Sequence, residues 1–315
     1  MFGRIHTAAL TMPLFILGGV AAGGSFWSTQ TLYWALFGVL FHFNGMMVNN
    51  LLDLPYDRKD PEKQHFPLVA GRISESSAWA LLLLGHGAGL TSIFLLSLGT
   101  NAWAIGLLFV MLGWLYNVEC KEHPVRAPLW NSLTTTLIPV FSFYSTSSEL
   151  NMAGVLLFLY VFLLATFQIG YEGSLKDINS DEENLVKLLG ARVEDGMFIP
   201  RYSLPTGVAI RAGMLVTALL IVQATGGGIP ALVFAGVLGA LMVSLAYRLL
   251  RPQKWDHRRL LKRLGVNEII MYFTLLASFT PLLGFGTVDF LAAAMLFWFM
   301  AWNRFYWGTW LTPVV

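Results

Sequence analysis

Two short acidic stretches carry the residues of this sequence that are best suited to chemistry. The first, NNLLDLPYDRKD, places Asn49, Asp53 and Asp57 four residues apart, and the second, YEGSLKDINSDEEN, repeats that spacing with Asp177 and Asp181. Residues four apart share one face of a helix. Carboxylate and amide oxygens suit Mg²⁺, which takes one or two protein carboxylates and completes its shell with water and substrate phosphate. The stretches therefore predict two metal sites able to hold a diphosphate.

The acidic pattern occurs twice, and this favours a functional interpretation over a structural one. A single stretch of this kind at a membrane surface is more often a solvated helix end. Two matching stretches, each following an apolar run and four such runs apart, favour a weak internal repeat with a shared task. Metal ions on both sides of a diphosphate make it a better leaving group, because they neutralise the charge that develops as its carbon–oxygen bond breaks.

The rest of the chain is apolar enough to lie in lipid. Of its 315 residues 56% are hydrophobic and only 12% are charged, with a mean hydropathy of +0.63, whereas soluble domains carry about 25% charged residues. Runs long enough to span a membrane lie near 8–24, 31–52, 77–98, 101–118, 128–146, 151–171, 206–224, 229–250, 267–285 and 288–308. We expect an all-α, polytopic transmembrane helical bundle of nine to ten helices with cytoplasmic cap loops, forming one domain over residues 1–315.

Local signals refine this organisation. Pro55 lacks the amide hydrogen of a helix interior, so the second helix is expected to end near Asp53, with Asp57 just beyond it. The polar connection 172–205 is short enough to be a cap, in which LVKLLG predicts a brief amphipathic helix. Within the third run, Gly85 and Gly89 are four apart and predict close helix packing. His42 is expected either to line a cavity or, with better odds, to make a structural hydrogen bond.

The basic residues predict the topology. All 20 Lys and Arg are assigned to the segment before the first run, to the C-terminal end or to alternate connections, and five of them are assigned to the connection after the sixth run: Lys176, Lys187, Arg192, Arg201 and Arg211. The remaining connections contain only Glu149 and Asp289 as charges. Because positive residues collect in cytoplasmic loops, both termini and both acidic stretches are predicted to be cytoplasmic. This topology explains the basic loops without a nucleic-acid partner, and the net charge is only +2.

These motifs resemble those of the UbiA superfamily of intramembrane prenyltransferases, and the resemblance covers nearly the whole chain. Its members pair an NDxxDxxxD motif after helix 2 with a KDxxD-type motif after helix 6, and here the corresponding residues are Asn49, Asn50, Asp53, Asp57, Lys176, Asp177, Ile178 and Asp181. HFPLVAGRIS is similar to the family's NRPLxSGxIS loop. The resemblance implies that Asn49 and the four aspartates bind Mg²⁺, as two ions, and that the aspartates act in catalysis on a prenyl diphosphate.

Several residues depart from the family pattern. Asn50 stands where an Asp is frequent, and Phe66 replaces an Arg that commonly contacts the diphosphate, so another cation is needed. Tyr116 and Lys121 resemble a Tyr/Lys pair after helix 4, one residue further apart than usual. The expected substrate-binding residues are Asn49, Asn50, Lys63, Tyr116, Lys121, Arg126, Gln168, Glu172 and Lys176. For Lys63, Lys121 and Arg126, an equally weighted alternative is that they only follow the rule that basic residues collect in cytoplasmic loops.

The sequence favours one of the three function classes that stay open. A secondary transporter would place its ionisable residues near the bilayer midplane, whereas these carboxylates are expected at helix ends. The favoured function is transfer of an isoprenyl group to a hydrophobic aromatic or lipid acceptor within membrane lipid. The alternative is a terpene cyclase on the same scaffold, which ionises the same diphosphate without an acceptor, and the motifs do not separate these two enzymes.

Overall fold

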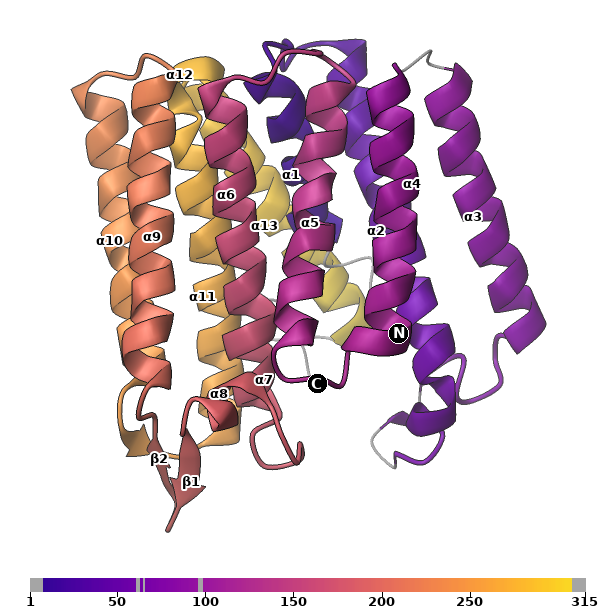
Figure 1. The fold of residues 1–315 in the computed structure, drawn as a ribbon, viewed down its shortest axis with the longest axis vertical. Coiled ribbons are helices and arrows are strands. Elements are labelled where there is room, and N and C mark those ends of the chain that lie inside the picture. Colours follow the sequence, from indigo (N-terminus) through magenta and orange to yellow (C-terminus); the bar gives the residue numbers. More distant parts are fainter. Residues whose placement is uncertain (1–7, 61–62, 65, 96–98, 308–315) are drawn as a thin grey trace. The chain divides into compact units, whose positions relative to one another are not determined.

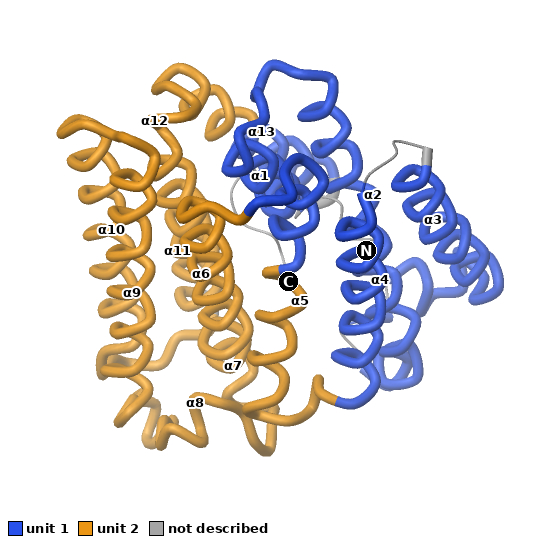
Figure 2. Tube along the Cα trace, turned by 45° about the horizontal axis from the view of Figure 1, so that its top comes forward, with its two compact units in different colours: residues 1–119, 137–149, 295–315 blue, residues 120–136, 150–294 orange. Residues whose placement is uncertain are grey.

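The computed structural model describes residues 8–60, 63–64, 66–95 and 99–307, which form two compact units (Figure 2). Unit 1 comprises residues 1–119, 137–149 and 295–315, and unit 2 comprises residues 120–136 and 150–294. Two helices, α5 (Arg126–Tyr144) and α13 (Phe285–Trp307), contribute residues to both units. The expectation of one domain over residues 1–315 stays a prediction.

Unit 1 is built mainly from the first four helices (Figure 1). These are α1 (Ala8–Ala21), α2 (Thr29–Asp57), α3 (Glu75–Leu95) and α4 (Thr100–Leu115), and α4 continues into the π-helical segment η3 (Tyr116–Cys120). Consecutive helices pack on one another. Small residues permit the close approach, because a Cβ on Gly38 would lie 3.0 Å from Met12 Cα and one on Gly85 would lie 2.1 Å from Asn44 Oδ1. The packing predicted for Gly85 is confirmed.

Unit 2 contains four long helices and a small cap. The helices are α6 (Met152–Phe167), α9 (Ser203–Ala224), α10 (Ile229–Leu250) and α11 (His257–Ser278); the short elements are η4 (Gln168–Gly173), α7 (Ser174–Lys176), α8 (Leu185–Leu188) and α12 (Thr280–Leu283). The chain packs α9 against α6 and α10, and α10 against α11. The amphipathic helix predicted within LVKLLG is α8.

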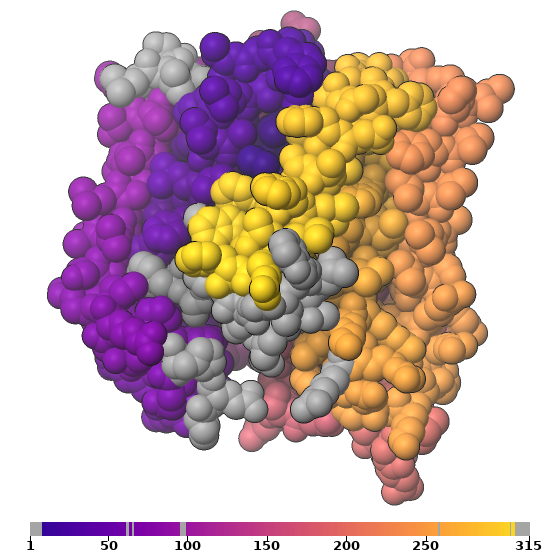
Figure 3. Space-filling model, turned by 180° about the vertical axis from the view of Figure 1, so that it is seen from behind, coloured from indigo at the N-terminus to yellow at the C-terminus, as the bar shows by residue number. Residues whose placement is uncertain are grey.

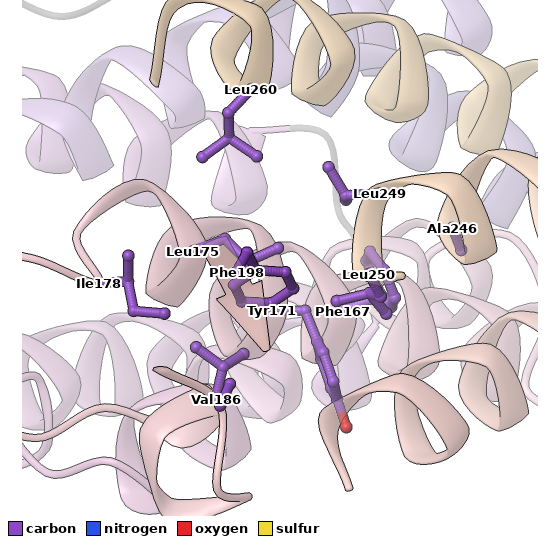
Figure 4. Close-up of a cluster of buried hydrophobic side chains, with 11 residues drawn as sticks. Phe167, Tyr171, Leu175, Ile178, Val186, Phe198, Ala246, Leu249, Leu250 and Leu260 are labelled. Carbon is purple, nitrogen blue, oxygen red and sulfur yellow. The ribbon is translucent and has the colours of Figure 1, made fainter. Parts of the chain in front are cut away.

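The cap of unit 2 also contains a three-stranded antiparallel sheet that the sequence patterns did not reveal. Strands β1 (Arg192–Glu194) and β2 (Met197–Ile199) form a hairpin, and β3 (Gln253–Lys254) pairs with β2. The hairpin turn is Asp195–Gly196, both with positive φ (49° and 72°), as a two-residue turn requires. Phe198, Val186 and Ile178 anchor the cap in the buried cluster of Figure 4.

The protein is an integral membrane protein, and the polytopic all-α prediction is confirmed. Seven of the described helices are long and apolar enough to span a membrane. Large apolar side chains point outward from them, including Leu83, Phe94 and Val237, as contact with lipid requires. The surface of α13, yellow in Figure 3, likewise exposes Phe290 and Phe297.

Two predicted helix boundaries are wrong. The run expected to begin near 267 belongs to α11, which begins at His257; Asp256 caps it by accepting from Arg259 N at 3.0 Å, and the basic residues of its first turns are good helix formers despite their low hydropathy. Helix α2 does not end near Asp53 but continues to Asp57, with Pro55 inside it. Arg58 N donates to Leu54 O at 3.1 Å, so the proline removes one hydrogen bond without ending the helix.

Candidate active site

The first acidic stretch forms the last turns of α2. Because the helix continues to Asp57, Asn49, Asp53 and Asp57 all lie on regular helix and share one face. Asn49 and Asp53 are half-buried, whereas Asp57 is only 8% exposed. Asn50 and Asp57 border a small hollow of about 10 Å³ together with Phe66, which is room for about one water molecule. The side-chain oxygens of Asn49, Asp53 and Asp57 therefore lie along one face of the last turns of α2.

The loop HFPLVAGRIS packs against this helix end. Leu68 belongs to the buried cluster that contains Leu51 and Leu54, so the loop is anchored by apolar contacts. Its turn closes where Arg72 N donates to Pro67 O at 2.9 Å and Gly71 adopts a φ of +69°, a conformation that favours glycine. The structure thus brings the loop and the first acidic stretch together. His65 lies outside the described residues.

Lys63 supplies a positive charge beside Asp57. Its Nζ lies 2.7 Å from Asp57 Oδ1 and 3.7 Å from Asp60 Oδ2. Partial burial works to lower the pKa of Lys63, but the hydrogen bond and charge of Asp57, with the charges of Asp60 and Asp53, raise it above its ordinary 10.5. Lys63 is therefore an ammonium at neutral pH, in the neighbourhood where Phe66 replaces the family's arginine.

The second acidic stretch lies on the cap of unit 2. Asp177 caps the short helix α7, and Asp181 N donates to Asp177 O at 2.9 Å. Asn184 Nδ2 donates to Asp181 Oδ2 at 3.3 Å, and the Lys187 ammonium donates to Asp181 O. Asp177 is half-buried, while Asp181 and Lys176 are exposed. Turns rather than a continuous helix hold this second pair of carboxylates.

Glu172 joins a buried ionic cluster in unit 2. Its Oε1 accepts from Arg211 Nη2 at 3.2 Å and from Asn267 Nδ2 at 2.5 Å, and the guanidinium lies 3.8 Å from the Phe167 ring centroid. Arg211 Nε and Nη1 and Asn267 Oδ1 have no hydrogen-bond partner among the described residues. The assignment of Arg211 to a loop is wrong: it lies inside α9 and is fully buried, because Glu172 and the ring face compensate its charge.

Gln168 lies one turn before Glu172 and makes its own polar contact. Its Nε2 donates to Glu268 Oε1 at 2.6 Å. No sequence pattern predicts that Arg211, Asn267 and Glu268 contact these two residues, because α9 and α11 reach them only by packing. Of the expected substrate-binding residues, Glu172 thus lies in a buried ionic cluster, and Gln168 pairs with Glu268 in a partly buried contact.

Two π-helical segments at the ends of membrane helices contain or precede residues that were expected to bind substrate. Segment η3 begins at Tyr116 and is followed by Lys121, and segment η4 precedes Lys176 and Asp177. Such π-helical segments are frequent at functional sites. Tyr116 and Lys121 are half-buried, and Arg126 is exposed at the start of α5. His42 makes a hydrogen bond, with Nδ1 2.8 Å from Thr11 Oγ1, as the structural interpretation expects.

Unit 1 encloses an aromatic cavity of about 100 Å³. Its walls include Phe15, Phe37, Phe41, Phe109 and Phe141, whose rings pack edge-on, tilted or stacked; the Phe37 and Phe141 centroids are 5.2 Å apart with an interplanar angle of 13°. Three polar residues, Asn44, His86 and Asn117, also line it. Sequence reasoning missed these three. The available signal was polar side chains inside apolar runs, which usually face a helical interior or cavity.

The carboxylate oxygens of the two acidic stretches are suitable ligands for Mg²⁺ that binds together with a diphosphate. No group of three or more His, Cys, Asp or Glu side chains able to hold a metal ion occurs within the described residues. Mg²⁺ bound with a phosphate substrate needs only one or two carboxylates. Asp53 and Asp57 on α2, and Asp177 and Asp181 on the cap, meet that requirement by donor chemistry.

Comparison with known proteins assigns the family. Residues 10–267 match the UbiA prenyltransferase family, and the chain belongs to it. A 2-acylphloroglucinol 4-prenyltransferase of Humulus lupulus is 29% identical over 170 residues, 50% of this chain and 40% of the relative, so the matched region is less than half of that protein's length.

Solved structures share the fold. A UbiA homologue from Aeropyrum pernix K1 matches with a TM-score of 0.66 and 21% identity, covering 87% of this chain and 97% of that one. A UbiA homologue from Archaeoglobus fulgidus bound to GPP and Mg²⁺ matches with a TM-score of 0.59 and 16% identity, covering 89% and 99%.

Proposed function

We propose that the protein is a Mg²⁺-dependent prenyltransferase that moves an isoprenyl group from a prenyl diphosphate to a hydrophobic aromatic or lipid acceptor. The observation that carries the proposal is the end of α2, where Asn49, Asp53 and Asp57 lie on one helical face beside the Lys63 ammonium. Membership of the UbiA family and the GPP and Mg²⁺ held by the Archaeoglobus fulgidus homologue support it.

The residues have distinct roles in this proposal. Asp53, Asp57, Asp177 and Asp181, with Asn49, would hold Mg²⁺, as two ions, together with the diphosphate. Bound Mg²⁺ neutralises the charge that the leaving diphosphate develops. Lys63, Lys121, Arg126 and Lys176 donate to phosphate oxygens, with Tyr116 and Asn50 as neutral donors. Lys63 can exchange its contact with Asp57 for a phosphate oxygen when a metal ion takes that carboxylate.

Product analysis tests transfer against cyclisation. Purified protein is incubated with Mg²⁺ and prenyl diphosphates of several chain lengths, with and without a lipid extract or an aromatic acceptor, and products are identified by mass spectrometry. We expect little diphosphate release without an acceptor and a prenylated product with one. Rapid, metal-dependent conversion of a prenyl diphosphate alone into a cyclic hydrocarbon or terpene alcohol would instead establish a cyclase.

The sidedness of the membrane protein is part of the proposal. We propose that both termini and both acidic stretches are cytoplasmic, since the basic residues of the connections gather with them. Reporter fusions at Glu149 and after Gly227 are expected to report the opposite side. A cytoplasmic signal from either fusion contradicts this topology.

A further inference from the structure

Basic side chains are concentrated where α10 joins α11 in unit 2. Seven of the 20 Lys and Arg lie within residues 248–263, where Asp256 is the one acidic residue. Five of these basic residues are exposed and are called the basic group here: Arg248, Arg251, Lys254, Arg259 and Lys262.

The charges of the basic group are not compensated within the described residues, where none of the five makes an ion pair. Asp256 uses Oδ1 to cap α11, accepting from Arg259 N at 3.0 Å. Other basic side chains do have acidic partners: Arg58 with Glu75, Lys63 with Asp57, Arg192 with Glu194 and Arg211 with Glu172. A tendency of basic residues to collect on one side of the membrane explains their presence but not this difference in pairing.

Helix α10 places part of the basic group at the level of lipid headgroups. The helix has 22 residues and is therefore about 33 Å long, close to the roughly 30 Å of a bilayer's hydrocarbon core. Val233, Val237 and Leu241 are exposed along one face, which contacts acyl chains. Arg248 and Arg251 continue that face at helical spacing where the helix ends.

Two exposed tyrosines mark the same level of the membrane. Tyr202 directly precedes α9 and Tyr247 lies in the last turn of α10, and both are exposed. The two helices pack on each other, with the start of α9 and the end of α10 at the end that carries the strands (Figure 1). Aromatic side chains with a polar group gather at membrane–water interfaces, so Arg248 and Arg251 lie where lipid phosphates are.

We propose that the basic group binds the phosphate groups of anionic membrane phospholipids, whose acyl chains lie along the exposed apolar face of α10. Guanidinium and ammonium groups donate charge-assisted hydrogen bonds to phosphate oxygens, and basic residues beside a membrane attract anionic lipids. A zwitterionic lipid carries its own positive charge and gains less. Since β3 pairs with β2, a bound lipid also holds the cap of unit 2 at the membrane surface.

Native mass spectrometry of the purified full chain in detergent micelles tests the lipid preference. Dioleoylphosphatidylglycerol and dioleoylphosphatidylcholine have the same acyl chains and differ in net charge. We expect the phosphatidylglycerol to bind at least about ten-fold more tightly, since each basic residue near an anionic headgroup contributes about five-fold. Equal affinities would overturn the proposal.

Matched double variants locate the site. Arg248→Gln with Arg251→Gln should weaken phosphatidylglycerol binding about 30-fold and leave phosphatidylcholine binding unchanged, while Arg248→Lys with Arg251→Lys should stay within about three-fold of wild type because the charges remain. The control, Lys59→Gln with Arg72→Gln, removes two exposed charges from unit 1 and should bind as wild type. Equal losses in the control and the first variant would overturn the site. Should the first variant fail to fold, Lys254→Gln with Lys262→Gln replaces it.

Salt and competing phosphates identify the source of the bound group. The preference for phosphatidylglycerol should shrink between about 0.1 M and about 1 M salt, because the Debye length falls from about 10 Å to about 3 Å; an unchanged preference contradicts an exposed site. Inorganic phosphate should displace the lipid no better than chloride of equal ionic strength, and stronger displacement would assign the site to free phosphate.

Geranyl diphosphate separates this inference from the proposed function. With Mg²⁺, it should bind equally to the wild type and to Arg248→Gln with Arg251→Gln, and a loss confined to geranyl diphosphate would assign the basic group to the substrate and overturn the lipid site. If the lipid preference follows the variants but no prenyl group is transferred, the lipid site stands and the proposed transferase activity is wrong.

Discussion

The two units bury polar side chains under different conditions. In unit 2 the Arg211 guanidinium lies against Glu172 and the Phe167 ring, and Asn267 completes the carboxylate's contacts. In unit 1 the amide oxygens of Asn44 and Asn117 are buried and have no hydrogen-bond partner among the described residues, although both residues line the aromatic cavity. The first cluster brings its own counter-charge from neighbouring helices, so it holds α6, α9 and α11 together. Both clusters leave buried polar atoms without a partner among the described residues, Arg211 Nε and Nη1 and Asn267 Oδ1 in unit 2 and the two amide oxygens in unit 1, but the unit 2 cluster carries charges, whereas the unit 1 amides are neutral.

The difference lies in the cost of burying a charged side chain compared with a neutral one. A charge inside a membrane protein is expensive and requires a partner, and Arg211 has one within the protein. A neutral amide costs less, about 1–3 kcal/mol when unpaired, so a fold tolerates it without a counter-charge. Neither cluster contains the aspartates of the acidic stretches, which lie at helix ends and in turns.

The largest expected effect tests whether both units take part in the chemistry. Asp53→Asn, Asp57→Asn, Asp177→Asn and Asp181→Asn should each lower kcat/KM by about 100-fold or more, because losing one metal-binding carboxylate costs several kcal/mol of transition-state stabilisation. EDTA should abolish activity and Mg²⁺ should restore it. Asp195→Asn, in the cap hairpin turn, is the control and should keep wild-type rates. A folded variant with near-normal turnover removes its residue from the site.

The next effect concerns the stability of the ionic cluster in unit 2. Arg211→Leu should lower the free energy of unfolding by about 3–5 kcal/mol, because it leaves Glu172 buried without its counter-charge. The double variant Arg211→Leu with Glu172→Leu should recover much of that loss. Thermal melts in detergent measure both. A single variant as stable as the wild type would show that the ion pair does not hold these helices.

The same type of substitution in unit 1 should act in the opposite direction. Asn44→Leu removes an unpaired buried oxygen, so in the absence of ligand it should raise the free energy of unfolding by up to about 1–3 kcal/mol. The measurement is the same thermal melt, with Gly87→Leu as the control for a change outside the cavity. A destabilised Asn44→Leu would mean that this amide already has a structural task, and the contrast between the two units would fail.

The smallest effect belongs to Lys63. The pair with Asp57 is partly solvent-exposed on the lysine side, 40% of the side chain, so Lys63→Met should cost at most about 1 kcal/mol. Because the pKa of Lys63 is raised above 10.5, the pair's contribution is fully present below that pH and is lost as the pH rises through the folded-state pKa. The melting difference between wild type and Lys63→Met should be constant from about pH 7 to 10 and shrink above 10.5. A difference that disappears near neutral pH would contradict the ion pair.

Much of the organisation was predictable because the signals are local. Apolar runs long enough to span a membrane, with polar connections between them, predict the helices, and the acidic spacing depends only on the helical repeat. Predictions failed where local signals compete. Pro55 was expected to end α2, but a single lost hydrogen bond did not outweigh packing along Leu51 and Leu54. The start of α11 was misplaced because hydropathy does not detect a capped, basic helical turn.

The sequence by itself determined the membrane class, the family motifs and the four-residue spacing of Asp53 and Asp57, whereas the structure showed that α2 continues to Asp57. Only the tertiary structure decided that Arg211 is a buried partner of Glu172 rather than a loop cation, and that Asn44, His86 and Asn117 line one cavity. The physical reason is that these partners come from different helices. Helix periodicity fixes which residues share a face, but the helix that covers that face, and the space left between them, follow from the packing of side chains far apart in the chain.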